Sequence, residues 1–392
     1  MIVPGFKAAA VAAGLKYQDR PDLGLIVAER PVDAAGVFTR SVVQAAPVLW
    51  CRERLAGGRA AAILVNAGQA NACTGPEGRR AAEASARAAA RAVGCRPEEV
   101  LLASTGVIGA PLNLPALEKA LPALAAGLKE DGLEDTARAI MTTDTRPKTA
   151  VAGGEIEGRL FTVAGLAKGS GMIAPDMATM LSFILTDAAV EAGFLREVLT
   201  RSARQTFNCV TVDGDTSTND CVLALAGGRA GNLKITGPSS PGAVVFEEAF
   251  LSVAADLAKM IAADGEGATK LVLVRVDGAP DADQARLAAL TVANSPLVKT
   301  ALFGEDANWG RLMMALGRSG AAFDPEKVDI SLDEAPLVRD GRDAGHEAAA
   351  AQVMKKKEFA VNINLKAGPG RAAIWTCDFS YDYVKINANY RS

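Results

Sequence analysis

Residues 168–181 read KGSGMIAPDMATML, and this stretch carries most of what the sequence says about fold and chemistry. Its glycines let the backbone approach another group closely, and Pro175 stiffens the turn that follows. Small Ala178 then precedes Thr179, which opens an apolar run over residues 179–185. A continuous apolar run of this length predicts a strand that is buried on both faces. Taken alone, Thr179 is an ordinary β-branched strand residue.

A second interpretation makes Thr179 a nucleophile. Threonine needs a neighbouring base, and the chain contains one histidine, His346, at the expected start of a helix. Cleavage before Thr179 would instead supply an α-amine, whose ordinary pKa of about 7.7–8.0 suits it to take the hydroxyl proton. Thr179 can make that cut itself by attacking the Ala178 carbonyl, and a small residue at position 178 leaves room for the attack.

Composition limits the class of protein. The 392 residues are 49% hydrophobic and 22% charged, which allows about two domains with a sizeable core. Lys and Arg (42) against Asp and Glu (45) give a net charge of −3, which disfavours nucleic acid as a partner. No run approaches the ~20 apolar residues of a membrane span, and the six cysteines form no C-x-x-C pair. The sequence therefore predicts a cytoplasmic protein with reduced thiols.

Strand-like and helix-like segments alternate along the chain and predict an α+β fold with antiparallel hairpins. Strands are expected over residues 61–65, 100–103, 159–166, 179–185, 270–276, 359–365 and 372–379. Helices are expected over residues 117–128, 134–141, 194–207, 244–263 and 347–357. Thr74 and Glu77 predict a capping box for a further helix that ends at Gly94. The candidate soft joint at residues 237–242 could equally be a surface loop.

Three familiar ligand motifs fail. The chain has no G-x-x-x-x-G-K-[ST] phosphate loop. Residues 169–174 match G-x-G-x-x-A, but Pro175 and the following strand leave barely one turn where a dinucleotide needs a full helix. Residues 213–217 resemble the start of a calcium loop, but Thr218 stands where glycine is required. We therefore expect neither a metal nor an organic cofactor.

The stretch at 168–181 strongly resembles the self-processing signature of the ornithine acetyltransferase family, also called glutamate N-acetyltransferase or ArgJ. The resemblance runs nearly end to end, and its motifs occur in the family's order. They are GFKAAAVAAGLK (5–16), NAGQANACTG (66–75), STGVIG (104–109), MTTDT (141–145), VTVDGDTSTND (210–220), DGEGATK (264–270), GEDANWGR (304–311) and VKINANYRS (384–392).

This resemblance implies a fold, an activity and an assembly. The family's fold is an αββα layered sandwich shared with DmpA aminopeptidases, with about residues 280–392 contributing to a smaller second α/β domain. Its activity moves acetyl from N2-acetylornithine to glutamate in arginine biosynthesis by a ping-pong route. Self-cleavage at Ala178–Thr179 would give chains 1–178 and 179–392, which usually pair as an α2β2 heterotetramer. Some members also use acetyl-CoA as a donor, and no residue here separates the two kinds.

By motif, Thr179 is the acetyl-accepting nucleophile, and Thr105 with Gly106 matches the oxyanion-hole pair. Residues 104–106 are expected just past a strand end, where a loop can aim donors at a developing alkoxide, although alone they predict an ordinary turn. The residues that match substrate contacts are Thr142, Lys168, Thr179, Glu266, Asn387 and Ser392.

Among the substrate contacts, Lys168 would supply a cation for an α-carboxylate and Glu266 an anion for an amino group. Without the resemblance, both would be expected as surface charges. Asn387 and Ser392 would otherwise belong to a frayed tail, and many relatives end in Thr where this chain ends in Ser392.

Two other functions stay open. A hydrolase, like the related aminopeptidases, would use water in place of glutamate as acceptor. A binding protein that kept only the fold would stay a single chain and never be acetylated. The motifs on both sides of Thr179 favour acetyl transfer over hydrolysis, and the intact Ala178–Thr179 and Thr105–Gly106 pairs disfavour a silent protein.

Overall fold

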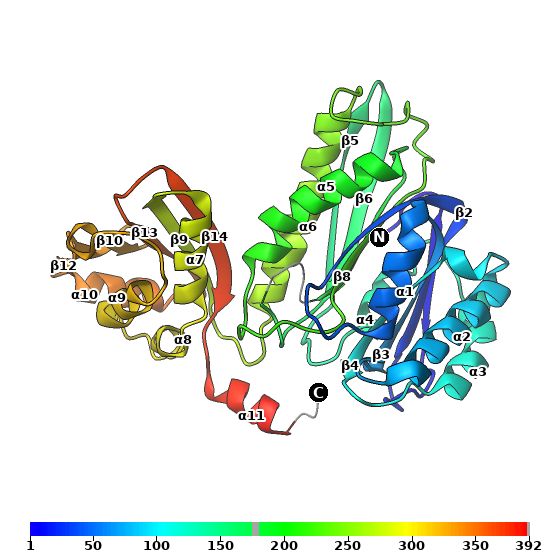
Figure 1. The fold of residues 1–392 in the computed structure, drawn as a ribbon, viewed down its shortest axis with the longest axis horizontal. Helices are drawn as coiled ribbons and strands as arrows, with labels where there is room; N and C mark the ends of the chain where they lie inside the picture. The colour runs from blue at the N-terminus through cyan, green and yellow to red at the C-terminus, as the bar shows by residue number, and fades with distance from the viewer. Residues whose placement is uncertain (175–179, 390–392) are drawn as a thin grey trace. The chain divides into compact units, whose positions relative to one another are not determined.

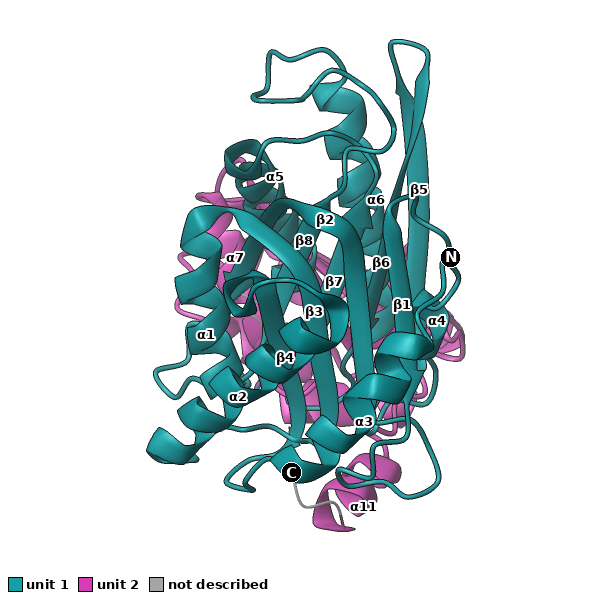
Figure 2. Ribbon diagram, turned by 90° about the vertical axis from the view of Figure 1, so that its right-hand side faces the viewer, with its two compact units in different colours: residues 1–208, 215–261, 392 teal, residues 209–214, 262–391 magenta. Residues whose placement is uncertain are grey.

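The computed structural model describes residues 1–174 and 180–389, and the chain forms two compact units (Figures 1 and 2). Unit 1 runs over residues 1–208 and 215–261, and unit 2 runs over residues 209–214 and 262–391. The candidate joint at residues 237–242 lies within unit 1 as a largely exposed loop, so it is not the boundary. None of the helices described is long and apolar enough to cross a membrane.

Unit 1 is built on one eight-stranded sheet with the order β4-β3-β2-β8-β7-β6-β5, and β1 pairs with β2. Its strands are β1 (Phe6–Val11), β2 (Leu23–Phe38), β3 (Arg59–Gln69), β4 (Val100–Val107), β5 (Lys148–Ile156), β6 (Arg159–Lys168), β7 (Leu181–Thr186) and β8 (Cys221–Ala226). The pairs β3–β4 and β7–β8 are parallel, and the other neighbours are antiparallel.

Strand β2 changes partners along its length. Residues 23–27 pair with β1 and β3, whereas residues 33–38 pair with β8. The register with β3 shifts between Val27 and Val32, an irregularity of the kind that bends a strand. The sheet therefore has two halves joined through β2, one containing β1, β3 and β4 and the other containing β5 to β8.

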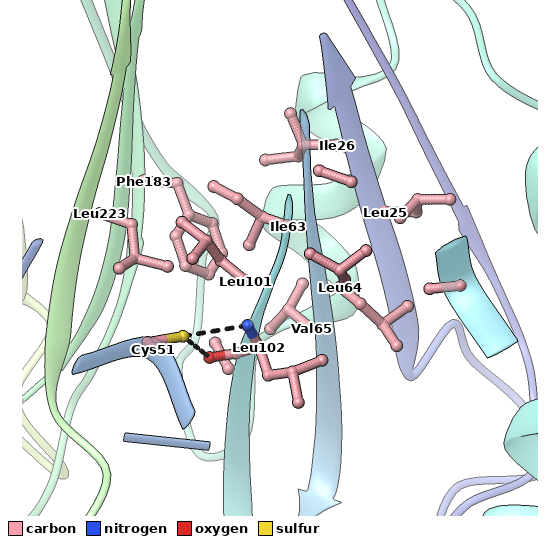
Figure 3. Close-up of a cluster of buried hydrophobic side chains, with 14 of the residues drawn as sticks. Leu25, Ile26, Cys51, Ile63, Leu64, Val65, Leu101, Leu102, Phe183 and Leu223 are labelled. Carbon is pink, nitrogen blue, oxygen red and sulfur yellow. Dashed lines mark hydrogen bonds between the residues drawn. The ribbon is translucent and has the colours of Figure 1, made fainter. Parts of the chain in front are cut away.

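A single apolar cluster fills the space between the two halves (Figure 3). Phe183 of β7 and Leu223 of β8 approach it from one side, and Ile63 of β3 and Leu101 of β4 approach it from the other. All four side chains are fully buried. The two halves thus pack face to face as the two β layers of a sandwich.

Helices cover the outer faces of this sandwich and give it four layers. They are α1 (Ala46–Arg54), α2 (Gly75–Val93), α3 (Leu114–Ala126), α4 (Leu133–Ala139), α5 (Ala192–Gln205) and α6 (Ala243–Ala263). Helices α1 and α2 pack on β4, and α5 packs on β2 and β8. Gly165 of β6 leaves room for Val253 and Leu257 of α6, which a Cβ at that position would strike. The predicted αββα layered sandwich is confirmed.

Most of the predictions about single strands, turns and helix ends are confirmed, but one at the start of a helix is wrong. All six residues of β7 are buried, as the apolar run indicated. Hairpin β5–β6 turns at Glu157 and Gly158, which both have positive φ, as a tight two-residue hairpin turn requires. The capping box is wrong: Thr74 precedes α2, but its hydroxyl donates to Asn71 Oδ1 at 2.9 Å and does not cap the helix. Gly94 ends α2 with a left-handed backbone, as expected.

Unit 2 is built on a six-stranded sheet with the order β12-β11-β10-β13-β9-β14. Its strands are β9 (Leu271–Ala279), β10 (Asp329–Leu332), β11 (Ala335–Arg339), β12 (Arg342–Asp343), β13 (Glu358–Asn364) and β14 (Gly370–Cys377). Its helices are α7 (Ala282–Ala293), α8 (Pro296–Phe303), α9 (Trp309–Gly317), α10 (Glu347–Met354) and α11 (Tyr381–Asn389). Strand β9 separates β13 from β14, so these two neighbours in sequence form no hairpin.

The segment 209–214 joins unit 2 although it lies between β7 and β8 of unit 1 in sequence. The Thr211 amide donates to the Trp375 carbonyl of β14 at 2.9 Å. The core of the unit contains the alternating residues Val272, Val274 and Val276 of β9, each fully buried.

The packing between the β layers predicts a large difference between two apolar substitutions. Phe183→Ala should lower the free energy of unfolding by about 3–5 kcal/mol, because it removes a fully buried ring from the central cluster. Leu160→Ala, at a side chain that is 75% exposed, should change it by no more than about 0.5 kcal/mol. Denaturant unfolding measures both, and equal effects would contradict the two-layer core.

Candidate active site

The ends of β4 and β6 meet although they belong to opposite halves of the sheet. Lys168, the last residue of β6, donates from Nζ to Thr105 Oγ1 at 3.3 Å. Lys168 is buried, at 8% exposure, and it forms no ion pair within residues 1–174 and 180–389. The charges of Asp144 and Asp220 act on Lys168 without direct contact, and a bound anion would offset part of the cost of burying its ammonium. The geometry thus indicates a binding position for an anion beside Thr105.

The surroundings of Gly106 leave room for no residue other than glycine. It lies in β4 next to Gly68 of β3, with φ at +126°, and a Cβ there would collide with the Gly68 backbone. The expectation that residues 104–106 form a loop past the strand is wrong, because β4 continues to Val107. The two residues that match the oxyanion pair therefore stand on a rigid strand end.

Asp144 ties the turn at residues 142–144 to the residues that follow β6. Its Oδ2 accepts from the Thr142 amide at 3.0 Å, and its Oδ1 accepts from Lys148 Nζ and the Gly169 amide, each at 2.7 Å. Thr143 Oγ1 and Ser170 Oγ share a further hydrogen bond of 2.7 Å. Burial raises the pKa of Asp144, but the charges of Lys168 and Lys148 and the hydrogen bonds outweigh it and lower the pKa to about 2. Asp144 is therefore an ionised carboxylate at neutral pH.

Asn219 connects the start of β8 to the ends of β3 and β4. Its Nδ2 donates to the Ala70 carbonyl at 2.6 Å and to the Ser104 carbonyl at 2.9 Å. The next residues join β8 to β7, because the Cys221 amide donates to the Met180 carbonyl at 3.0 Å. Met180, the residue directly before β7, is thereby linked through the start of β8 to the strand end that carries Thr105.

Asp220 is a second buried carboxyl group near the same strand ends. Its Oδ2 has no hydrogen-bond partner within the part of the chain that is described. Burial raises the pKa of Asp220 well above its ordinary value, while hydrogen bonds with Ser217 and the charge of Lys168 act in the opposite direction. The surroundings therefore shift the two groups in opposite directions, lowering the pKa of Asp144 and raising that of Asp220.

Two further expected substrate contacts, Glu266 and Asn387, lie in unit 2. Glu266, which is buried, accepts from Asn387 Nδ2 of α11 at 2.8 Å. Asn387 is thus held by a side-chain contact in an ordered helix, and the frayed-tail alternative is wrong for residues 381–389. Ala178, Thr179 and Ser392 lie outside the described residues.

Sequence reasoning missed Asp144, Lys148, Asn219 and Asp220 as members of the site. Three of them stand inside motifs that were quoted for the resemblance, MTTDT and TSTND. Polar residues in turns are ordinarily solvated, so residue type gave no sign that these side chains are buried. The available signal that such side chains are buried is a run of several polar, mostly uncharged residues directly before an apolar strand.

Metal ligands do not gather in the described part of the chain. Within residues 1–174 and 180–389, no group of three or more His, Cys, Asp or Glu side chains could hold an ion. His346 is exposed and precedes α10.

The fold and these contacts define a class of protein: a two-unit α+β protein whose αββα sandwich holds a buried lysine and two buried carboxyl groups at its strand ends. The sequence model of the ArgJ family matches residues 7–392. The arginine biosynthesis bifunctional protein ArgJ of Desulfotalea psychrophila is 52% identical, with both chains fully covered. The protein of the same name from Symbiobacterium thermophilum is 51% identical, covering 99% of this chain and 97% of that one. This chain therefore belongs to the ArgJ family.

A solved structure agrees with this placement. The crystal structure of the arginine biosynthesis bifunctional protein ArgJ from Bacillus halodurans matches with a TM-score of 0.52 at 43% identity. The match covers 100% of that chain and 54% of this one. The family resemblance expected from the sequence motifs is confirmed.

The Gly106 environment predicts a contrast between two glycines with positive φ. Gly106→Ala should destabilise the protein by about 2–4 kcal/mol, because backbone strain adds to a collision with the Gly68 backbone. Gly109→Ala, at φ of +82° with no atom near the added Cβ, should cost only about 1 kcal/mol. Thermal unfolding of both variants measures this, and equal losses would mean that the strands separate to admit the methyl group.

The raised pKa of Asp220 predicts that wild type loses stability as the pH rises and that a neutral side chain at this position prevents the loss. Because its pKa is raised in the folded protein, the unfolded chain ionises first, and stability falls as pH rises above about 4. Asp220→Asn removes this loss, so the variant's melting temperature relative to wild type should increase as the pH rises above about 4. Asp256→Asn, at an exposed position in α6, serves as the control. A difference that stays constant with pH would contradict a raised pKa.

Proposed function

We propose that this chain is an acyltransferase that moves an acetyl group from N2-acetylornithine to glutamate through an acetyl ester on Thr179. The observation that carries the proposal is the buried Lys168 ammonium, which contacts Thr105 and forms no ion pair among the described residues. Both proposed substrates bring an α-carboxylate to such a cation. The names of the relatives at about 50% identity, proteins of arginine biosynthesis, support the same reaction.

In the first half-reaction, the Thr179 oxygen attacks the acetyl carbonyl carbon of acetylornithine. The α-amine of Thr179, freed by cleavage, takes the hydroxyl proton. The oxyanion that forms receives hydrogen bonds at the β4 end from Thr105 and Gly106, which stand on a rigid strand and need not reorganise. The C–N bond then breaks, the departing amine of ornithine receives the proton, and an acetyl-Thr179 ester remains.

In the second half-reaction, the amine of glutamate attacks the ester carbonyl. The same oxyanion position stabilises the tetrahedral intermediate, and the proton from the attacking amine passes through the α-amine to the departing Thr179 oxygen. N-Acetylglutamate leaves, and the free nucleophile is restored. No metal or organic cofactor is required by these steps.

The remaining site residues contact different groups of the substrate. Lys168 binds the α-carboxylate in both half-reactions, and the Thr142 hydroxyl adds a polar contact. Glu266 attracts an amino group of the substrate, and Asn387 and Ser392 complete the contacts from the C-terminal residues. The hydrogen bond from Asn387 Nδ2 holds the Glu266 side chain in a fixed orientation.

Self-cleavage before Thr179 is part of the proposal. The chain of the Bacillus halodurans structure is matched in full by 54% of this chain. The proposed fragment 179–392 has 214 residues (392 − 178), about 55% of the 392 residues, which is close to that share. We further propose that the two fragments form an α2β2 heterotetramer in the cytoplasm.

Two alternatives differ from this proposal in the acceptor or the donor. A hydrolase would release acetate from acetylornithine instead of forming N-acetylglutamate. The relatives named above are called bifunctional, which supports testing acetyl-CoA as a second donor. A silent binding protein would form no acetyl ester at all.

The first test is the intact mass of the purified protein. Wild type should appear as two fragments, the second beginning Thr-Met-Leu-Ser-Phe, and should form N-acetylglutamate from acetylornithine and glutamate. Thr179→Ala should stay uncut and inactive, because the attacking oxygen is absent from both reactions. Thr179→Ser should keep part of each activity, since its hydroxyl remains.

A cut at residue 178 in Thr179→Ala would disprove self-processing by Thr179. Acetate release without N-acetylglutamate would identify a hydrolase. A cleaved wild-type protein that neither forms an acetyl ester nor transfers acetyl would reject the acyltransferase.

A further inference from the structure

Asp144 accepts from the backbone at one expected substrate contact, Thr142, and directly after another, Lys168. It accepts from the Thr142 amide directly, and it accepts from the Gly169 amide, the group that follows Lys168 in the chain. The turn before β5 and the end of β6 are thereby held by one side chain. Asp144 itself is 8% exposed overall, and its carboxylate side chain is fully buried.

Lys148 decides which cation contacts this carboxylate. Lys148, the first residue of β5, is fully buried, and its Nζ lies 2.7 Å from Asp144 Oδ1. Lys168 feels the same negative charge but forms no ion pair with Asp144, and its ammonium contacts the Thr105 hydroxyl instead. Asp144 thus makes its direct ionic contact with Lys148, whereas the Lys168 ammonium interacts with it through charge alone and contacts Thr105.

We propose that Asp144 is the positioning residue of the carboxylate-binding site, with Lys148 as its fixed counter-ion. Asp144 holds the backbone at Thr142 and Lys168 in place, and its pairing with Lys148 leaves the Lys168 ammonium for the α-carboxylate of the substrate. This inference rests on the proposed acetyl transfer. It means that two residues that do not touch the substrate contribute to its binding.

The charge and the hydrogen-bonding pattern of Asp144 are both needed for this role. Its two oxygens accept from three donors, whereas an asparagine side chain offers one oxygen and would direct its NH2 group at one of those donors. Asp144→Asn alone also removes the carboxylate that pairs directly with the buried Lys148 ammonium, a change that can prevent folding. The double variant Asp144→Asn/Lys148→Met removes both charges together, a replacement that buried pairs often tolerate.

The experiment measures KM and kcat for acetylornithine and glutamate, the calorimetric Kd for glutamate, and the melting temperature. The folded, cleaved double variant should raise both KM values and the Kd by about tenfold or more, because hydrogen bonds to a charged group are lost at both substrate contacts. Its kcat should stay within about threefold of wild type, because the nucleophile and the oxyanion donors are untouched.

Two further variants separate positioning from general stability. Asp187→Asn removes another buried carboxyl group of unit 1, whose Oδ1 accepts from the Thr162 amide at 2.6 Å beyond the far end of β7. It should lower the melting temperature without moving KM or Kd. Lys168→Met should raise both, and its effect should be smaller in the double-variant background, because there Lys168 is already misplaced.

Each outcome decides the inference. A folded, cleaved double variant with wild-type KM and Kd would overturn it, as would one that differs only in melting temperature. If Lys168→Met raises KM while the double variant does not, the proposed function stands and the inference fails. If wild type binds glutamate but transfers no acetyl, the proposed function fails, and the Kd values alone decide the inference. Wild type that neither binds glutamate nor transfers acetyl would overturn both.

Discussion

The bend in β2 is the constraint on which the site of unit 1 depends. In strand order, β4 and β6 are separated by β3, β2, β8 and β7, so five strand spacings of about 4.8 Å would place them roughly 24 Å apart in a flat sheet. Because β2 changes partners between its two halves, the sheet closes on itself and Lys168 Nζ lies 3.3 Å from Thr105 Oγ1. The apolar cluster between the layers stabilises this arrangement, so core packing and site geometry have a common origin.

The same closure of the sheet buries two carboxyl groups, and their surroundings shift their pKa values in opposite directions. Asp144 stays ionised because Lys148 and Lys168 lie near it and three donors contact its oxygens. Asp220 has fewer hydrogen bonds and an oxygen without a partner among the described residues, so burial prevails. The pKa values of two carboxyl groups close to one lysine are thus shifted in opposite directions, because charges and hydrogen bonds prevail at Asp144 and burial prevails at Asp220.

Local sequence predicted many elements of both units but misjudged two details for a physical reason. The run at residues 179–185 and the Gly94 helix end follow from burial and from backbone freedom, which act over a few residues. The end of β4 was placed too early because glycine weakens a strand, yet Gly106 stays in β4 since only glycine fits beside Gly68. Thr74 was assigned as a capping side chain, but Asn71, brought near by the turn, takes its hydroxyl.

The sequence by itself determined the family, through eight motifs in fixed order, and it singled out Thr179, Thr105, Gly106, Lys168 and Glu266 as candidates for chemistry. Tertiary structure alone decided that Lys168 and Thr105 meet, that Asn219 joins β8 to the β4 end, and that Asp144 holds Thr142 and Gly169. These contacts join residues from about 25 to more than 100 positions apart, except for the short turn at 142–144. Hydrophobic periodicity and turn chemistry act within a few residues, whereas burial, ion pairing and pKa depend on neighbours in space.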